Sequence, residues 1–84
     1  MIVSVYILLS LKDGSRYVGM SQNAERRLEE HNSGKNRYTK GHLPWKIIYI
    51  EESESWEAGR VREKYFKTSA GRIYLDRKLK GNHN

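Results

Sequence analysis

The chain has 84 residues, of which 16 are lysine or arginine and 10 are aspartate or glutamate, so its formal net charge is +6, and it contains no cysteine. The length suits one small domain, 1–84. The composition excludes disulfides, a thiol nucleophile and a thiolate zinc site, and no segment approaches the roughly 20 apolar residues that cross a bilayer. We therefore expect a cytoplasmic protein with neither a membrane nor a disulfide partner.

The positive charge is concentrated in two parts of the chain. Residues 1–59 contain eight basic and eight acidic side chains, whereas residues 60–84 contain eight basic and two acidic ones. A second basic stretch, 31–46, contains four lysine or arginine residues and no acid. Two such surfaces are typical of a protein that binds the phosphate backbone of nucleic acid, although a solvated basic face without a partner has the same composition.

The first predicted element is a β-hairpin. Val3–Leu9 is rich in β-branched and apolar residues, and this pattern resumes at Arg16–Met20. The Asp13-Gly14 pair between them indicates a type I′ turn, in which both central residues have positive φ. Because the first strand is apolar on both faces, we expect it at the centre of its sheet.

A helix, a loop and a third strand follow the hairpin. Asn23 is placed to cap a helix over Ala24–Asn32, which Gly34 ends. A polar loop, Ser33–Pro44, then precedes a predicted strand at Trp45–Ile50.

Two helices complete the predicted domain. One spans Ser55–Lys67, and a short one follows a cap at Ser69, before a frayed tail at Gly81–Asn84. Their apolar residues, which we expect to face the core, are Trp56, Ala58, Val61, Tyr65, Phe66, Ile73, Tyr74 and Leu79. The order β-β-α-β-α-α predicts an α/β (α+β) fold, with a small three-stranded antiparallel sheet flanked by helices.

Five segments carry the residues that could perform chemistry. Singly, each has an ordinary structural explanation, because tyrosines on an apolar strand pack in cores and charged helix residues form solvated faces. In chain order they resemble the GIY-YIG nuclease superfamily, which includes small stand-alone bacterial proteins similar to the incision domain of excision-repair nucleases and to structure-selective junction nucleases. The matching segments are Val5-Tyr6-Ile7, Tyr17-Val18-Gly19, Arg27, His31 and Arg62-Glu63-Lys64.

The resemblance extends from Tyr6 to about Leu79. Shorter matches lie between the main segments: Glu25-Arg26-Arg27-Leu28, Glu30-His31-Asn32-Ser33-Gly34, Tyr38-Thr39 and Pro44-Trp45. Two features depart from the family pattern: Val5 replaces the glycine of the first half-motif, and neither Met20 nor Ser21 supplies the basic residue that some relatives in the repair branch have after the second half-motif. The late asparagine of the family also has no clear counterpart.

The resemblance implies an endonuclease that hydrolyses DNA with one Mg²⁺ or Mn²⁺ ion, in DNA repair or recombination. It assigns Tyr6 and Tyr17 to the two half-motifs and Glu63 to the single acidic metal ligand. Arg27 and His31 take the positions of the family's arginine and of its histidine or tyrosine on the first helix.

The chemistry of these side chains agrees with such a site. A free tyrosine is only about 0.1% ionised at neutral pH, and neighbouring cations such as Arg27 or a metal favour its phenolate. We expect Tyr6 to be the favoured base or water-positioning group, with Tyr17 beside it. His31 hydrogen-bonds to a tyrosine, and Glu63 holds the metal behind the leaving group. Further contacts to the substrate are expected from Gly19, Lys35, Arg37, Lys40 and Arg62.

Two other functions also fit the sequence. A non-catalytic module of the same fold would bind nucleic acid without cutting it, and its binding would be sensitive to salt. A protein with core tyrosines and a solubilising basic surface would have no affinity for nucleic acid at physiological salt. The filled key positions favour the nuclease. The preferred DNA structure, the choice between DNA and RNA, which tyrosine is the general base, activity without a partner, and the oligomeric state stay open.

Overall fold

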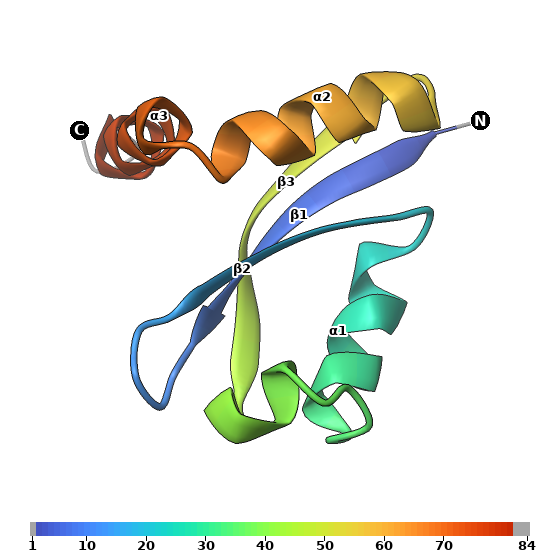
Figure 1. Ribbon diagram of the computed structural model, residues 1–84, viewed down its shortest axis with the longest axis vertical. Coiled ribbons are helices and arrows are strands. Elements are labelled where there is room, and N and C mark those ends of the chain that lie inside the picture. The colour runs from blue at the N-terminus through green and yellow to red at the C-terminus, as the bar shows by residue number, and fades with distance from the viewer. Residues whose placement is uncertain (1, 82–84) are drawn as a thin grey trace.

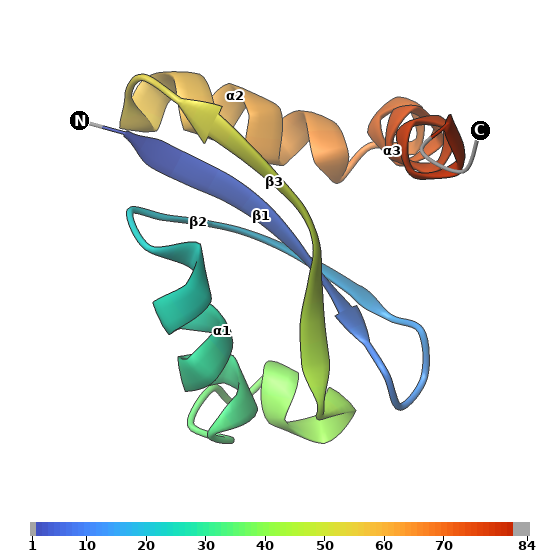
Figure 2. The ribbon, with the colours of Figure 1, turned by 180° about the vertical axis from the view of Figure 1, so that it is seen from behind.

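The computed structural model describes residues 2–81 as three strands, three α-helices and one short 3-10 helix (Figures 1 and 2). The elements are β1 (Val3–Ser10), β2 (Arg16–Ser21), α1 (Ala24–Asn32), η1 (Thr39–His42), β3 (Trp45–Ser53), α2 (Trp56–Phe66) and α3 (Ser69–Gly81). The strands form one antiparallel sheet in the order β2-β1-β3. The predicted fold class, the order of elements and the central position of the first strand are therefore confirmed.

The described residues end with α3. Gly81, assigned to the predicted tail, is the last residue of α3, and the rest of that tail lies outside the described residues. Within residues 2–81, no helix is long and apolar enough to cross a membrane.

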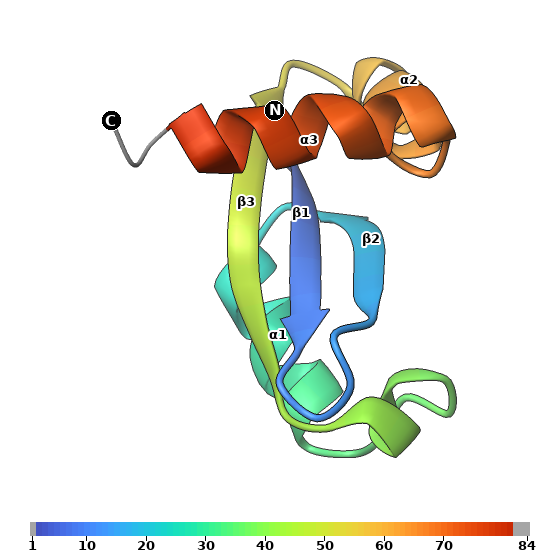
Figure 3. The ribbon, with the colours of Figure 1, turned by 90° about the vertical axis from the view of Figure 1, so that its left-hand side faces the viewer.

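One face of the sheet is covered by α2 and α3, and Figure 3 shows α3 lying across the strands. Side chains of a strand point alternately to the two faces, so the odd-numbered residues of β1 supply this one. Val5 and Ile7, both fully buried, pack there with Phe66 and Leu75. This cluster is the main apolar core.

The other face of the sheet is covered by α1. Tyr6 and Leu8 of β1 pack there with Ala24 of α1 and Trp45 at the start of β3. Because β1 is buried on both faces, its near-continuous apolar sequence is explained.

The ends of α1 agree with the sequence. Asn23 Oδ1 accepts a hydrogen bond of 3.0 Å from the backbone N–H of Arg26, which caps the helix. Gly34, with a φ of 82°, follows the last turn. These caps set the two ends of α1, the helix that carries Arg27 and His31.

The turn between β1 and β2 differs from the predicted type I′ turn. Among residues 2–81 no residue other than glycine has positive φ, so Asp13 lacks the conformation that this turn requires, while Gly14 has a φ of 79°. A longer loop, 11–15, joins the strands instead. In it Ser10 Oγ accepts the N–H of Asp13 at 3.2 Å, and Asp13 Oδ1 accepts the N–H of Ser15 at 3.0 Å. Side chains thus add to the backbone hydrogen bonds of this loop, which run from the N–H of Gly14 to the carbonyl of Ser10 at 3.0 Å and from the N–H of Ser10 to the carbonyl of Ser15 at 2.8 Å.

The prediction for the core face of α2 is confirmed for two of its five residues. Phe66 is 3% exposed and Tyr65 is half-buried, as expected. The prediction that Trp56, Ala58 and Val61 face the core is wrong, because all three are exposed.

Gly59 explains the difference in α2. This residue is buried, and a Cβ added to it would lie 2.8 Å from Met20 Cε and 3.6 Å from Val3 Cγ1. The helix therefore approaches the sheet through a glycine, two turns before Phe66, and its bulkier apolar side chains face outward. A search for periodic apolar residues does not detect a contact made by glycine.

The last helix is longer than predicted and uses a different core residue. α3 has 13 residues and buries Leu75, which is 2% exposed. Ile73 is 52% exposed, so its predicted core position is wrong, whereas Tyr74 and Leu79 pack partly buried against the core.

Arg62 connects β3, α2 and α3. Its guanidinium donates to both carboxylate oxygens of Glu51, at 2.5 and 3.0 Å. The same group lies over the rings of Tyr65, Phe66 and Tyr74, at 4.9, 4.8 and 5.5 Å from their centroids. The ion pair lowers the pKa of Glu51 and raises that of Arg62. The donors of Arg62 are thus directed into the fold, so we do not retain its predicted contact with substrate.

We expect Arg62→Ala to lower the free energy of unfolding by about 1–3 kcal/mol, because Glu51 would lose its partner and three rings would lose a stacked cation. Arg62→Lys should recover little, since an ammonium group cannot bind both carboxylate oxygens in a planar fork. The control is Arg60→Ala, an exposed position on the same helix, with an expected change within about 0.5 kcal/mol. Urea denaturation measures all three, and equal losses at the two positions would contradict this role.

Candidate active site

Tyr6 and His31 form a buried pair between the sheet and α1. Each residue is 1% exposed, and Tyr6 Oη lies 3.2 Å from His31 Nε2. The other ring nitrogen, His31 Nδ1, lies 3.0 Å from Oγ1 of Thr39, which is fully buried. Because a neutral imidazole has one donor and one acceptor nitrogen, His31 can link the two hydroxyl groups.

The second predicted tyrosine, Tyr17, lies beside this pair on β2. Its ring centroid is 4.8 Å from that of His31, in an edge-on arrangement, and 6.5 Å from that of Tyr6. Tyr17 is only half-buried, in contrast to Tyr6. Both tyrosines therefore meet at the same histidine, and Tyr17 is the one with access to solvent.

Arg27 lies one turn before His31 on α1. Its guanidinium forms an ion pair with Glu30, and 38% of its side chain is exposed. Burial raises the pKa of Tyr6, and the neighbouring Arg27 opposes this rise without cancelling it. Burial, assisted by the charge of Arg27, lowers the pKa of His31 below its usual value. Tyr6 and His31 are therefore both uncharged at neutral pH.

Gly19 makes room for Tyr6 on the neighbouring strand. The two residues are partners across β2 and β1, and a Cβ added to Gly19 would lie 2.4 Å from Oη and 2.5 Å from Cζ of Tyr6. Any larger residue would push the ring away from His31. The glycine predicted as a substrate contact thus has a steric role in the site.

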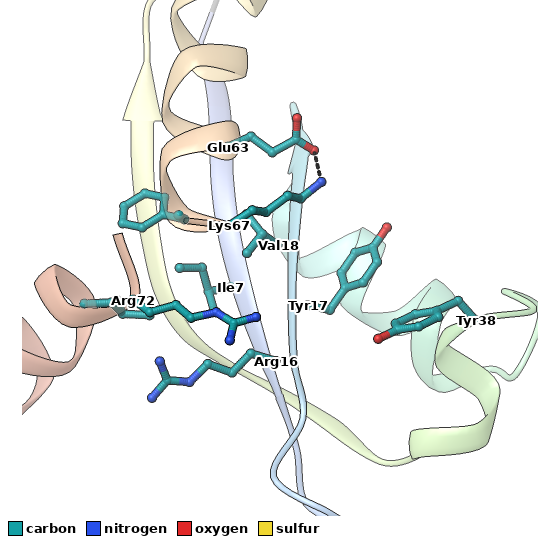
Figure 4. Close-up of a pocket in the computed structure, with 10 residues that line it drawn as sticks. Ile7, Arg16, Tyr17, Val18, Tyr38, Glu63, Lys67 and Arg72 are labelled. Carbon is teal, nitrogen blue, oxygen red and sulfur yellow. Dashed lines mark hydrogen bonds and ion pairs between the residues drawn. The ribbon is translucent and has the colours of Figure 1, made fainter. Parts of the chain in front are cut away.

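A cavity of about 340 Å³ at the edge strand β2 brings Glu63 together with Tyr17 (Figure 4). Glu63 projects into it from α2, and Tyr17 from β2. A second tyrosine and three cationic side chains share the lining: Tyr38, Arg16, Lys67 and Arg72.

The other three predicted catalytic residues, Tyr6, Arg27 and His31, do not line this cavity. They lie on the α1 side of the sheet, where Tyr17 contacts them through His31. Tyr17 is therefore the residue that connects the buried pair with the cavity.

Glu63 is the residue of this cavity that could hold a metal ion. Its side chain is 21% exposed, and its carboxylate lies 3.5 Å from Lys67 Nζ, one helical turn away. Within residues 2–81, no three histidine, aspartate or glutamate side chains converge as a metal site. A single carboxylate beside open space fits Mg²⁺ or Mn²⁺, which keep several waters and complete their coordination with substrate oxygens. It does not fit a structural zinc, which needs four protein ligands.

The predicted substrate contacts on the loop after α1 occupy two environments. Lys35 borders a separate cavity of about 400 Å³ together with Arg27, Glu30 and His31. Arg37 and Lys40 are exposed to solvent. These positions are consistent with a cationic surface near the site, without a defined pocket for Arg37 or Lys40.

Sequence reasoning gave no role to four residues of this region: Arg16, Tyr38, Thr39 and Arg72. For Tyr38-Thr39 a signal existed, since this pair matched the family pattern. The sequence held no signal for Arg16 and Arg72. They line one cavity because α3 lies beside β2, where Arg16 and Asp76 form an ion pair of 2.7 Å.

Comparisons with known proteins place the chain in one family. The model of the GIY-YIG catalytic domain matches residues 3–78. A UPF0213 protein from Bacillus licheniformis is 41% identical over 63 residues, which are 74% of this chain and 65% of that protein. A UPF0213 protein from Clostridium perfringens is 42% identical over 64 residues, 75% of this chain and 68% of that protein. The chain thus spans just under two thirds of the first relative and just over two thirds of the second.

A solved structure is similar over most of its length. The solution NMR structure of the UPF0213 protein BH0048 from Bacillus halodurans aligns with 96% of this chain and 87% of its own. The TM-score is 0.55 and the sequence identity is 34%.

We expect Gly19→Ala to lower the free energy of unfolding by about 1–3 kcal/mol, because the added methyl group overlaps the ring of Tyr6. The change should also separate Tyr6 from His31, which NMR shifts of the two rings would report. Gly41→Ala is the matched control, since nothing lies within 4 Å of its added Cβ and its φ is not positive. Equal stability of the two variants in urea would contradict the steric role of Gly19.

The depressed pKa of His31 predicts a pH dependence of stability. Below about pH 6.5 the unfolded chain protonates this histidine more readily than the folded protein does, so the unfolded state binds more protons. The free energy of unfolding should therefore fall as the pH decreases through about 6.5, and level off below the folded pKa. Urea denaturation between about pH 5 and 8 measures this slope.

A second histidine provides the control for this experiment. His31→Asn should remove the slope, whereas His42→Asn, which alters a histidine paired with Asp13 near the surface, should leave the His31 contribution in place. An NMR titration midpoint of His31 above 6.5 would contradict the assignment.

Proposed function

The chain belongs to the GIY-YIG catalytic domain family, and we propose that it is an endonuclease that hydrolyses phosphodiester bonds of DNA with one Mg²⁺ or Mn²⁺ ion. The observation that carries this proposal is the cavity shared by Tyr17 and Glu63, with the buried Tyr6–His31 pair directly behind Tyr17. A role in DNA repair or recombination is part of the proposal, since nucleases of this type act on such intermediates.

We assign the base to Tyr17 and not to Tyr6, which the sequence had favoured. A base must reach the water that it deprotonates, and Tyr6 is 1% exposed with a raised pKa. Tyr17 lines the cavity and contacts His31 with its ring. In this assignment Tyr6 holds His31 in place, and His31 in turn packs against Tyr17.

The hydrolysis then proceeds by one displacement. A water oxygen forms a bond to phosphorus while the bond to the leaving 3′ oxygen breaks. The phenolate form of Tyr17 takes the proton of the attacking water at Oη and becomes the neutral phenol, and the leaving oxygen takes a proton from solvent. A divalent ion at Glu63 would neutralise charge on the phosphate and on the leaving oxygen.

The cationic side chains around the cavity would position the phosphate. Arg16, Lys67 and Arg72 line it directly, and phosphate attracts such groups through charge-assisted hydrogen bonds. Lys67 is paired with Glu63, so a divalent ion bound there would release its ammonium group for the substrate. Arg27 lies outside this cavity, on the α1 side of the sheet, with a partly exposed guanidinium. Its proposed role, to stabilise negative charge on the phosphate, therefore requires a substrate that extends to that side.

One observation favours a second candidate function. The single carboxylate of the cavity is paired with Lys67, and an internal cation at this position would suit a protein that binds nucleic acid without cutting it. Such a module would bind independently of metal and would lose affinity steeply with salt.

We expect Glu63→Gln and Tyr17→Phe to reduce nicking of flapped or branched DNA in Mg²⁺ or Mn²⁺ by at least about 100-fold, because each removes a group that acts on the reacting atoms. Tyr6→Phe should cause a smaller loss, since it acts only through His31. The matched control is Glu57→Gln, an exposed glutamate in the first turn of the same helix, which should cut at the wild-type rate.

Gel assays of the end-labelled DNA distinguish the two candidate functions. Undiminished cutting by Glu63→Gln would contradict the metal-dependent mechanism. Metal-independent, salt-sensitive binding with no cutting by the wild-type protein would instead support the binding module.

A further inference from the structure

Tyr38 is an aromatic residue that the fold leaves open to solvent. It is 57% exposed, and its ring lies at the rim of the cavity that contains Tyr17 and Glu63 (Figure 4). The ring centroid is 6.0 Å from that of Tyr17 and 5.4 Å from that of His42. One edge of Tyr38 is therefore supported by other rings, while much of its surface faces water.

The backbone around Tyr38 is firmly held. Asn36 Oδ1 accepts the N–H groups of Tyr38 and Thr39, at 3.0 and 3.2 Å. The hydroxyl of Thr39 contacts His31, and its carbonyl oxygen accepts the indole N–H of Trp45 at 2.9 Å. Because its neighbour is fixed to the buried histidine, Tyr38 has a defined position relative to the site, and little backbone order has to be gained on binding.

Cationic groups share the two cavities that Tyr38 lines. Arg16 and Arg72 line the main cavity with Tyr38, and they also line an adjoining cavity of about 440 Å³. Asp76 pairs with Arg16 at 2.7 Å, while both of these side chains stay partly exposed. An open aromatic ring beside arginines is the combination by which proteins bind single-stranded nucleic acid, since the ring stacks on a base and the cations bind the backbone.

We propose that Tyr38 stacks on an unpaired nucleobase beside the phosphate that is cut, while Arg16 and Arg72 bind the backbone of the same strand. In a duplex each base is covered by its neighbours on both faces, so a ring can stack only where the strand is open. The substrate class is therefore nucleic acid with a single-stranded segment at the cleavage position, such as a flap or an open fork. This inference rests on the proposed nuclease for the identity of the cut phosphate, but the stacking site itself requires only binding.

A protein partner is a weaker explanation for the exposed ring. Charged side chains line both cavities around Tyr38. The main cavity also contains apolar side chains of the core, and the adjoining one is formed by Arg16, Arg72, Asp76 and the hairpin loop. Protein interfaces are depleted in charge at their centres, whereas cations next to an aromatic ring suit a polyanion.

The test measures equilibrium binding in EDTA, where no cleavage occurs. Fluorescence anisotropy compares a labelled single strand with a fully paired duplex of the same sequence. Tyr38→Ala should weaken single-strand binding by about 5- to 100-fold and duplex binding far less. Tyr38→Phe and Tyr38→Trp should keep the single-strand affinity, because both keep a stacking ring.

Trp56→Ala is the matched control, since Trp56 is 45% exposed and lines neither of the two cavities that contain Tyr38. It should bind the single strand as the wild-type protein does. Thermal unfolding of each variant would establish whether the fold is kept.

The outcomes separate this inference from the proposed nuclease. An unchanged single-strand affinity in Tyr38→Ala overturns the stacking site, even where the wild-type protein cuts DNA. A loss in Tyr38→Phe as large as that in Tyr38→Ala overturns it too, because the hydroxyl would then be the contact. Ring-dependent binding by a wild-type protein that cuts no DNA supports the stacking site and leaves the nuclease rejected.

Discussion

The buried hydroxyl of Tyr6 is the constraint on which the candidate site depends. A polar group placed inside a protein without a partner costs several kcal/mol, and this one lies on the central strand, under α1. His31 provides the partner, and Gly19 provides the space for the ring. Thr39 then occupies the second nitrogen of His31. One hydroxyl thus requires four chain segments to meet at fixed positions, which is why these residues serve the fold and the site together.

The edge strand β2 joins this buried pair to the side of the molecule that carries Glu63. Gly19 and Tyr17 are two residues apart on β2, so they share a face, and the first admits Tyr6 while the second packs against His31. The opening beside Tyr17 extends to Glu63 on α2, which lies on the other face. A strand with a free edge is the place where side chains from both faces of a sheet can approach one phosphate, because no further strand separates them.

Most of the fold follows from local signals in the sequence. The apolar first strand, the Asn23 cap and the Gly34 stop each depend on neighbouring residues, so the sheet and α1 were predictable. The contacts of α2 and α3 were not predictable, because they are made by Gly59, which has no side chain, and by Arg62, which is charged. The hairpin turn differed because Ser10 and Asp13 offer their side chains to the backbone, which the Asp-Gly signal alone does not reveal.

The candidate site was predictable as a set of residues and not as an arrangement. The family pattern names Tyr6 and Tyr17 alike, and only burial distinguishes the enclosed hydroxyl from the one that faces the cavity. The pattern also contains Tyr38-Thr39, and the structure gives a reason for the pair. The hydroxyl of Thr39 contacts His31, and Tyr38 is therefore held at the rim of the cavity. Tyr38, the proposed recognition residue, is one position from Thr39, which anchors His31. The proposed substrate contact and the proposed alignment of the base therefore belong to a single packing unit. In this proposal, specificity arises within the domain itself, because the loop that carries Tyr38 and the histidine that packs against the proposed base share one set of hydrogen bonds.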